Sequence, residues 1–281
     1  IRYGDIAAAR LELGADRRVT RGAVALGGAQ PRLPDVGALR ISGAVDRLQV
    51  AAWAAFIGSR AAPAPGGATV DAIDLEAETV ELGVLTFPQQ TIQADRRRHG
   101  WSVELAGPRL TGRVDWPHGE GGRVTMALDH ADLVPGDGDE PAVDAPAEPR
   151  LNRVPDVDLR VDELAIAGRS IGELAITGRA SERAYRLDPI RWDSADHTFL
   201  AEGAWRPGES PVTELSGTFA SDRVGPLLKR LGYAEVVREA RSEGHFDLEM
   251  RSPLGVPDLA TLSGDLVFTL EDGHLERVEP G

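Results

Sequence analysis

Strict alternation of apolar and polar residues recurs along this chain, and it constrains the fold more than any other feature. In residues 73–78 the sequence Ile-Asp-Leu-Glu-Ala-Glu places apolar side chains at odd positions and acids at even ones. Residues 157–162 and 246–251 repeat the pattern. Because successive side chains of a β-strand point to opposite faces, each segment predicts a strand with one apolar and one solvated face.

Turn residues such as Gly107-Pro108, Pro207-Gly208 and Asp272-Gly273 separate the alternating segments. Short alternating segments punctuated by turns are typical of an antiparallel meander. The series is too long for one compact sandwich. The sequence therefore predicts a mostly β fold, an elongated, twisted antiparallel sheet that is rolled into an open groove of taco-like β-repeats, with two or three short helices packed on it.

Three segments are expected to be helical. Asp46 can cap a helix over 46–57, and Asp222 can cap one over 222–231, where apolar residues recur at helical spacing. A further short helix is expected over 234–241. Residues 132–149 contain many acids and prolines and no basic residue, so they predict a solvated loop.

A degenerate internal repeat links these landmarks. Asp46, Asp132 and Asp222 each follow a strand-like segment, and they are spaced by 86 and 90 positions (46 to 132 to 222). Repeats of this length indicate units that contact mainly their neighbours. The predicted organisation is the end of one β-repeat with its helix (1–60), a β-repeat (61–131), the acidic loop (132–149), a β-repeat with two helices (150–241) and the start of another β-repeat (242–281).

Composition excludes several classes of function. A net charge of −14 argues against nucleic-acid binding, which requires clustered Lys and Arg. The absence of Cys excludes thiol catalysis and disulfides within the chain. No apolar stretch approaches the roughly 20 residues of a membrane span, and the first residues do not resemble a signal peptide. We expect the chain to be part of a longer protein whose export signal or anchor lies elsewhere.

No motif predicts catalysis, a metal site or a cofactor. The six histidines show no HExxH spacing, and phosphate-binding glycine loops and nucleophile elbows are absent. Asp137-Gly138-Asp139 resembles the start of a calcium loop, but Pro141 and Ala142 occupy positions that need a ligand and a glycine. We therefore expect no enzymatic activity, no metal and no cofactor.

The alternating apolar face is the remaining candidate site. A closed core needs a second layer, and the few expected helices can cover only part of so many strands. An open sheet would expose an apolar trough, which requires a ligand or partner. The residues expected to line it are Ile73, Leu75, Val103, Leu105, Val124, Met126, Leu128, Val157, Leu159, Val161, Leu174, Ile176, Phe219, Phe246, Leu248, Met250, Leu266, Phe268 and Leu270.

The final third of the chain resembles a known family. Residues 215–233, which include Leu-Ser-Gly and then Ser-Asp-Arg-Val-Gly-Pro-Leu-Leu-Lys-Arg-Leu-Gly-Tyr, are similar to the C-terminal region of YhdP-type proteins of the AsmA-like superfamily, as are residues 262–281. These motifs carry no catalytic residues. The acidic insertion at 132–149 departs from the family's pattern.

The resemblance implies a periplasmic segment of a protein that is tethered to the inner membrane of a Gram-negative bacterium. Such proteins are expected to carry phospholipid acyl chains along a β-groove toward the outer membrane and to have a periplasmic or outer-membrane protein partner. The alternative is a structural or adhesive β-repeat with a closed core that binds a protein. A carbohydrate-active enzyme is the least favoured reading.

Overall fold

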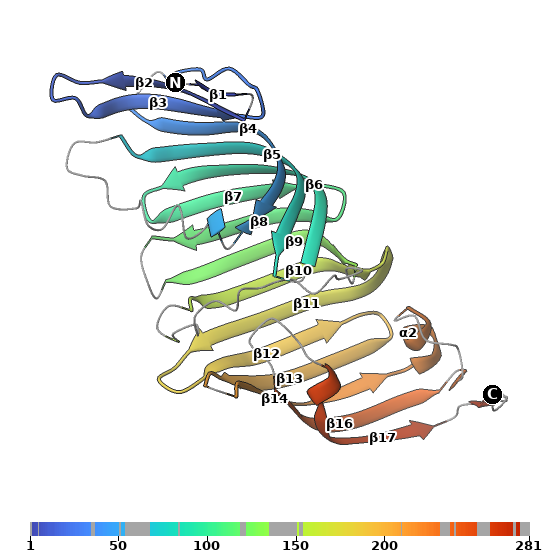
Figure 1. Ribbon diagram of the computed structural model, residues 1–281. Helices are drawn as coiled ribbons and strands as arrows, with labels where there is room; N and C mark the ends of the chain where they lie inside the picture. The colour runs from blue at the N-terminus through green and yellow to red at the C-terminus, as the bar shows by residue number, and fades with distance from the viewer. Residues whose placement is uncertain are drawn as a thin grey trace. The chain divides into compact units, whose positions relative to one another are not determined.

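The computed structural model shows a β-rich chain that divides into two compact units, Ile1–Gly119 and Glu120–Gly281 (Figure 1). Each unit is described by itself. The structure describes residues 2–4, 6–34, 37–50, 52–53, 68–83, 85–118, 122–134, 151, 154–208, 210–230, 237–238, 240–251, 259–271 and 274–275.

Unit 1 is a twisted sheet whose described strands lie side by side in chain order and do not close into a barrel (Figure 1). Its strands are β1 (Arg2–Tyr3), β2 (Ala7–Leu13), β3 (Val19–Leu26), β4 (Leu39–Gln49), β5 (Val70–Leu82), β6 (Leu85–Arg97), β7 (Gly100–Ala106) and β8 (Leu110–Pro117).

Unit 2 has the same open construction, with its main strands again ordered as in the chain. They are β9 (Arg123–Leu133), β10 (Asp156–Ile166), β11 (Arg169–Ala180), β12 (Tyr185–Asp193), β13 (His197–Arg206), β14 (Val212–Ser221), β16 (Arg241–Met250) and β17 (Ser263–Glu271). A separate pair joins β15 (Val237–Arg238) to β18 (His274–Leu275), and the described helices are α2 (Val224–Arg230) and the 3-10 turn η2 (Leu259–Thr261).

The expectation of a wholly antiparallel sheet is corrected at three places. β3 pairs with β4, β4 with β5, and β9 with β10 in parallel. Parallel neighbours need a crossover of a dozen or more residues, and long connections follow each first strand at 27–38, 50–69 and 134–155. The remaining described neighbours within each unit are antiparallel.

The helix expected over 46–57 does not begin at Asp46, because β4 continues to Gln49. Pairing of Arg47 with Thr79 and of Leu48 with Val80 continues the β-ladder, which outweighs the local capping signal. Residues 50 and 52–53 are helical, and 51 and 54–57 lie outside the described residues.

Two further expectations change in unit 2. Within the segment 234–241, Val237–Arg238 is strand β15 and Arg241 begins β16, so its described residues are not the expected helix. The acidic loop begins later than expected, because Asp132 and Leu133 belong to β9 and pair with β10; residues 135–149 lie outside the described residues. The helix expected over 222–231 corresponds to α2.

In unit 1, neighbouring strands change their alternation at the same level. The inward positions step by three, from the half-buried Val45 to the buried Leu48 in β4 and from Ala77 to Val80, both buried, in β5. Leu48 pairs with Val80, and both are 5% exposed. Beyond this step the paired ends of β4, β5 and β6 turn away from the direction of the other strands of unit 1 (Figure 1). The step thus keeps apolar side chains buried through a bend.

Candidate functional site

In unit 2, the strand register aligns apolar residues in three parallel rows on one face of the sheet. We call these rows the apolar strip. The first row is Val124, Val157, Gly178, Leu187, Gly203, Leu215, Leu248 and Gly264. The second is Met126, Leu159, Ile176, Ile190, Ala201, Gly217, Phe246 and Leu266, and the third is Leu128, Val161, Leu174, Trp192, Phe199, Phe219, Gly244 and Phe268.

No position of the apolar strip carries a charged side chain, and its one side-chain hydrogen-bonding group is already used. That group is the Trp192 Nε1–H, which donates to the carbonyl oxygen of Ile171 at 2.9 Å. With strands about 4.8 Å apart and two residues of rise between rows, the strip is roughly 34 Å long across the strands and roughly 13 Å wide. It offers contact area without directional polar contacts.

The strip is buried at some positions and accessible at others. Val124, Val161 and Phe246 are at most 5% exposed, whereas Leu266 and Phe268 on β17 are 57% and 54% exposed. Most other side chains of the strip are half-buried. In a face that a second protein layer covers, such positions would be buried throughout. Among the described residues of unit 2, regular structure other than β-sheet is limited to α2, η2 and the 3-10 residue Leu151.

In strands β12 to β16, a row of buried residues borders the strip at each end of the strands, and we call these rows its margins. At one end of these strands, Tyr185 and Trp205 pair with each other and are 3% and 1% exposed. The Tyr185 hydroxyl donates to the Pro155 carbonyl oxygen at 3.0 Å, and burial, reinforced by the charges of nearby aspartates, raises the pKa of Tyr185 to about 12. At the other end, His197, Ser221 and Ser242 form a buried polar row.

Unit 1 has a corresponding apolar face that is more closed. Val24, Ile41, Ile73, Ala94, Val103 and Val114 form one row across β3 to β8, and Leu26, Gly43, Leu75, Ile92, Leu105 and Gly112 form the next. On the central strands β5 and β6, Ile73, Leu75, Ile92 and Ala94 are 3%, 2%, 9% and 7% exposed. These side chains form a core in the usual sense.

The structure places every residue that alternation selected on these two apolar faces. Ile73, Leu75, Val103 and Leu105 lie in unit 1. In unit 2, Met250 pairs with Thr213 at one margin and Leu270 with Ser242 at the other. The remaining thirteen belong to the apolar strip: Val124, Met126, Leu128, Val157, Leu159, Val161, Leu174, Ile176, Phe219, Phe246, Leu248, Leu266 and Phe268. Contact with lipid remains a prediction for all of them.

Alternation alone missed other members of the strip. In β12 the register steps by three between Leu187 and Ile190. The step breaks the period of two, so the alternating pattern does not select Leu187, Ile190 or Trp192. In β13, Phe199 is followed by Leu200, so both faces look apolar there; Leu200 is 49% exposed on the opposite face. A search that tolerates one three-residue step would recover the β12 residues.

Cross-strand ion pairs cover the face opposite the apolar rows. In unit 1, Arg40 Nε lies 4.0 Å from Asp74 Oδ2, and Arg113 pairs with Glu104. In unit 2, Arg123 Nε lies 3.3 Å from Asp158 Oδ2. These side chains are largely exposed, so each pair contributes little stability, and together they keep this face solvated.

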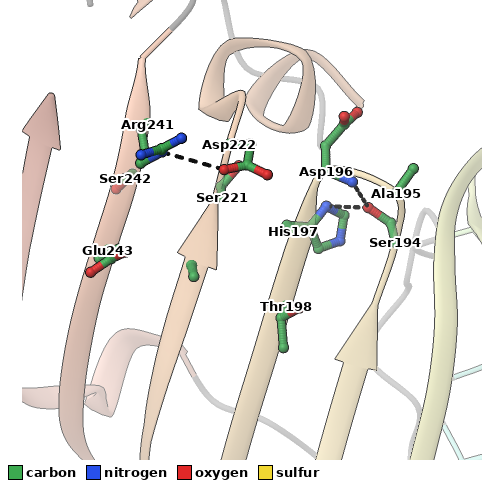
Figure 2. Close-up of a pocket in the computed structure, with 11 residues that line it drawn as sticks. Ser194, Ala195, Asp196, His197, Thr198, Ser221, Asp222, Arg241, Ser242 and Glu243 are labelled. Atoms are coloured by element: carbon green, nitrogen blue, oxygen red, sulfur yellow. Dashed lines mark hydrogen bonds and ion pairs between the residues drawn. The ribbon is translucent and has the colours of Figure 1, made fainter. Parts of the chain in front are cut away.

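A hollow of about 130 Å³ lies at the strand ends of unit 2, lined by residues 194–198, 220–222 and 241–243 (Figure 2). Thr198, Ala220 and Glu243 are aligned by register on the charged face, opposite the apolar strip. The nearby cations are engaged, because Arg241 Nε lies 3.4 Å from Asp222 Oδ1. The hollow also borders His197, Ser221 and Ser242, so it lies at the ends of the strands and is lined from both faces of the sheet.

Ser194 and His197 in this hollow resemble a nucleophile and its base, since Ser194 Oγ lies 2.6 Å from His197 Nδ1 (Figure 2). The serine hydroxyl also accepts a hydrogen bond from the Asp196 backbone N–H at 3.2 Å, and the Ser194 N–H donates to the His197 carbonyl. The Asp196 carboxylate is bound by Arg223. These bonds close the turn between β12 and β13. His197 faces the serine with Nδ1, the nitrogen that a catalytic triad directs at its carboxylate.

Among the described residues, no three metal-ligating side chains lie together in one group. No helix in this part of the chain is long and apolar enough to cross a membrane.

Comparison with known proteins identifies the family. No curated protein and no solved structure shows significant similarity to this sequence. The family model described as YhdP protein matches residues 1–281, which is the whole chain. The chain belongs to the YhdP protein family.

Proposed function

We propose that this chain is a periplasmic segment of a lipid transport protein anchored in the inner membrane, and that its apolar strip carries phospholipid acyl chains toward the outer membrane. The observation that carries the proposal is the strip itself, which is free of charged side chains and half-buried or exposed at most of its described positions. Membership of the YhdP family supports it.

Acyl chains match the chemistry of the strip. Each CH₂ group exposed to water costs about 0.8 kcal/mol, so a long acyl chain gains on the order of 10 kcal/mol from an apolar surface. Protein segments bring backbone N–H and C=O groups that need partners when buried, and the strip offers none. A surface without directional contacts also lets a chain slide. The proposal assigns no catalytic chemistry to this protein.

Substitution on the two faces of unit 2 tests the proposal. Leu159→Asp and Leu248→Asp place a carboxylate in the strip, whereas Leu200→Asp makes the same change on the opposite face. We expect both strip variants to lose most binding of a fluorescent-acyl phospholipid and most transport in the intact protein, and Leu200→Asp to retain both. Equal behaviour of the three variants would contradict the proposal, provided that circular dichroism shows each to be folded.

A closed-core structural repeat that binds a protein is the second candidate. It is favoured by one observation, the burial of Ile73, Leu75 and Ala94 at the centre of unit 1. If purified chain binds no phospholipid while all its strands are folded, this candidate replaces the first.

A further inference from the structure

The two halves of the apolar strip differ in chemistry. Its positions on β9 to β11 are aliphatic or glycine, among them Met126, Leu159 and Ile176. The aromatic residues of the strip all lie on β12 to β17: Trp192, Phe199, Phe219, Phe246 and Phe268. Aromatic residues make up only 5% of the sequence, so this grouping sets the second half apart.

Three of the aromatic rings, those of Trp192, Phe199 and Phe246, are in contact across strands. The rings of Phe199 and Phe246 are stacked, with centroids 5.2 Å apart and planes inclined by 15°. The ring centroid of Trp192 lies 6.2 Å from that of Phe199 and 4.4 Å from that of His197. Mutual packing fixes the rings and lowers the entropy lost when a ligand settles on them.

A glycine brings one of these rings close to the sheet. A Cβ atom at Gly244 would lie 2.5 Å from Cε1 and 2.8 Å from Cζ of Phe219, so the ring occupies the space above this glycine. Phe219 therefore lies over the neighbouring strand and remains half-exposed. The result is a broad apolar platform in which Phe246 is buried, while the other rings are half-buried or exposed and can contact an extended hydrocarbon chain.

We propose that this aromatic platform (Trp192, Phe199, Phe219, Phe246 and Phe268) is a holding site for one acyl chain, from which release is slower than from the aliphatic half of the strip. The inference rests on the proposed function and adds a location to it. Large aromatic side chains give more contact area per residue than Val or Leu, and here ring contacts and the close approach of Phe219 to Gly244 order four of the five. The aliphatic half then serves for passage and the aromatic half for retention.

Photo-crosslinking of the purified 281-residue chain tests the location. The probe is a phosphatidylcholine with a diazirine midway along one acyl chain, presented in vesicles of unlabelled phosphatidylcholine. We expect labelled peptides from β12 to β17 to exceed those from β9 to β11 at least threefold. Even labelling of both halves contradicts the holding site and leaves the proposed function intact. Absence of labelling contradicts both.

Release kinetics test the role of the rings. The double variant Phe199→Leu with Phe219→Leu keeps the strip apolar and removes two rings. We expect a fluorescent-acyl phosphatidylcholine to leave this variant for acceptor vesicles roughly fivefold faster. Phe87→Leu makes the same substitution at a buried ring in unit 1 and controls for general loss of stability. An unchanged release rate in the double variant, or an equal acceleration in the control, overturns the inference. The crosslinking experiment uses the unmodified chain, so a folding defect of a variant does not affect its result.

Discussion

The middle of unit 1 and the later strands of unit 2 present the same alternation with opposite exposure. Leu75 on β5 is 2% exposed, while Leu266 on β17 is 57% exposed, although both occupy apolar rows defined by register. Alternation therefore assigns a side chain to a face, and the place of the strand in the sheet affects its exposure. β5 lies between two strands, whereas β17 is the last described strand of its sheet and all of its residues are exposed. The comparison separates a buried apolar position from one that reaches solvent.

A carboxylate at each position should give the largest contrast. Leu75→Asp buries a charge without a partner, and we expect a loss of at least about 4 kcal/mol in the free energy of unfolding. Leu266→Asp places the same charge in solvent and should change stability by less than about 0.5 kcal/mol. Urea denaturation followed by circular dichroism measures both. Similar losses for the two variants would show that β17 is covered in solution.

Truncation of a leucine side chain to alanine should give a smaller difference in stability between the two faces, again with the larger loss in unit 1. Leu75→Ala opens a cavity in the closed face and should cost about 3 kcal/mol. Leu248 is half-buried in the apolar strip, so Leu248→Ala should cost only about 1 kcal/mol. Differential scanning calorimetry on the two variants provides the comparison. If Leu248→Ala costs as much as Leu75→Ala, the strip is a closed core at that position.

The buried margin at Tyr185 predicts an alkaline limit to the stability of unit 2. The pKa of Tyr185 is raised from the ordinary 10.0 to about 12, so the folded state holds the phenol proton more tightly than the unfolded state. Stability is unaffected below pH 10 and should fall between pH 10 and pH 12, by roughly 2–3 kcal/mol.

Chemical denaturation between pH 8 and pH 11.5 measures this loss. Tyr185→Phe removes the hydrogen bond to Pro155, so it should lower the free energy of unfolding by about 1 kcal/mol at pH 8. Above pH 10 the free energy of unfolding of this variant should fall less steeply than that of the unmodified chain. An equal decline in the variant would assign the alkaline loss to other groups.

Ion pairs on the opposite face should matter least. Arg123→Gln breaks the exposed pair with Asp158, and we expect stability to change by less than about 0.5 kcal/mol with no effect on lipid binding. A loss of lipid binding in this variant would mean that the charged face also contributes to the site.

Much of the fold was predictable because its signal is local. The alternation at 73–78 and 157–162 identified β5 and β10 and the correct apolar face in both. The paired three-residue steps were not predictable in the same way, since the step at Asp46 looks like a helix cap until β5 lies beside it. Parallel pairing depends on where a long connection returns, which the local pattern does not encode.

The candidate site was predictable as a set of residues and not as an open surface. Leu75 and Leu266 carry the same pattern, and only the three-dimensional arrangement separates their exposures. The aromatic platform was partly hidden, because the step between Leu187 and Ile190 displaces Trp192 from the expected period.

The central claim is that the accessible apolar strip of unit 2 holds acyl chains, and lipid recovered with the purified protein tests it most directly. The chain should be expressed in a Gram-negative bacterium, purified without detergent and extracted for lipid mass spectrometry beside Leu159→Asp and Leu200→Asp. The account predicts bound phospholipid in the unmodified chain and in Leu200→Asp, and its loss in Leu159→Asp. Phospholipid absent from all three, or present equally in all three, would contradict it.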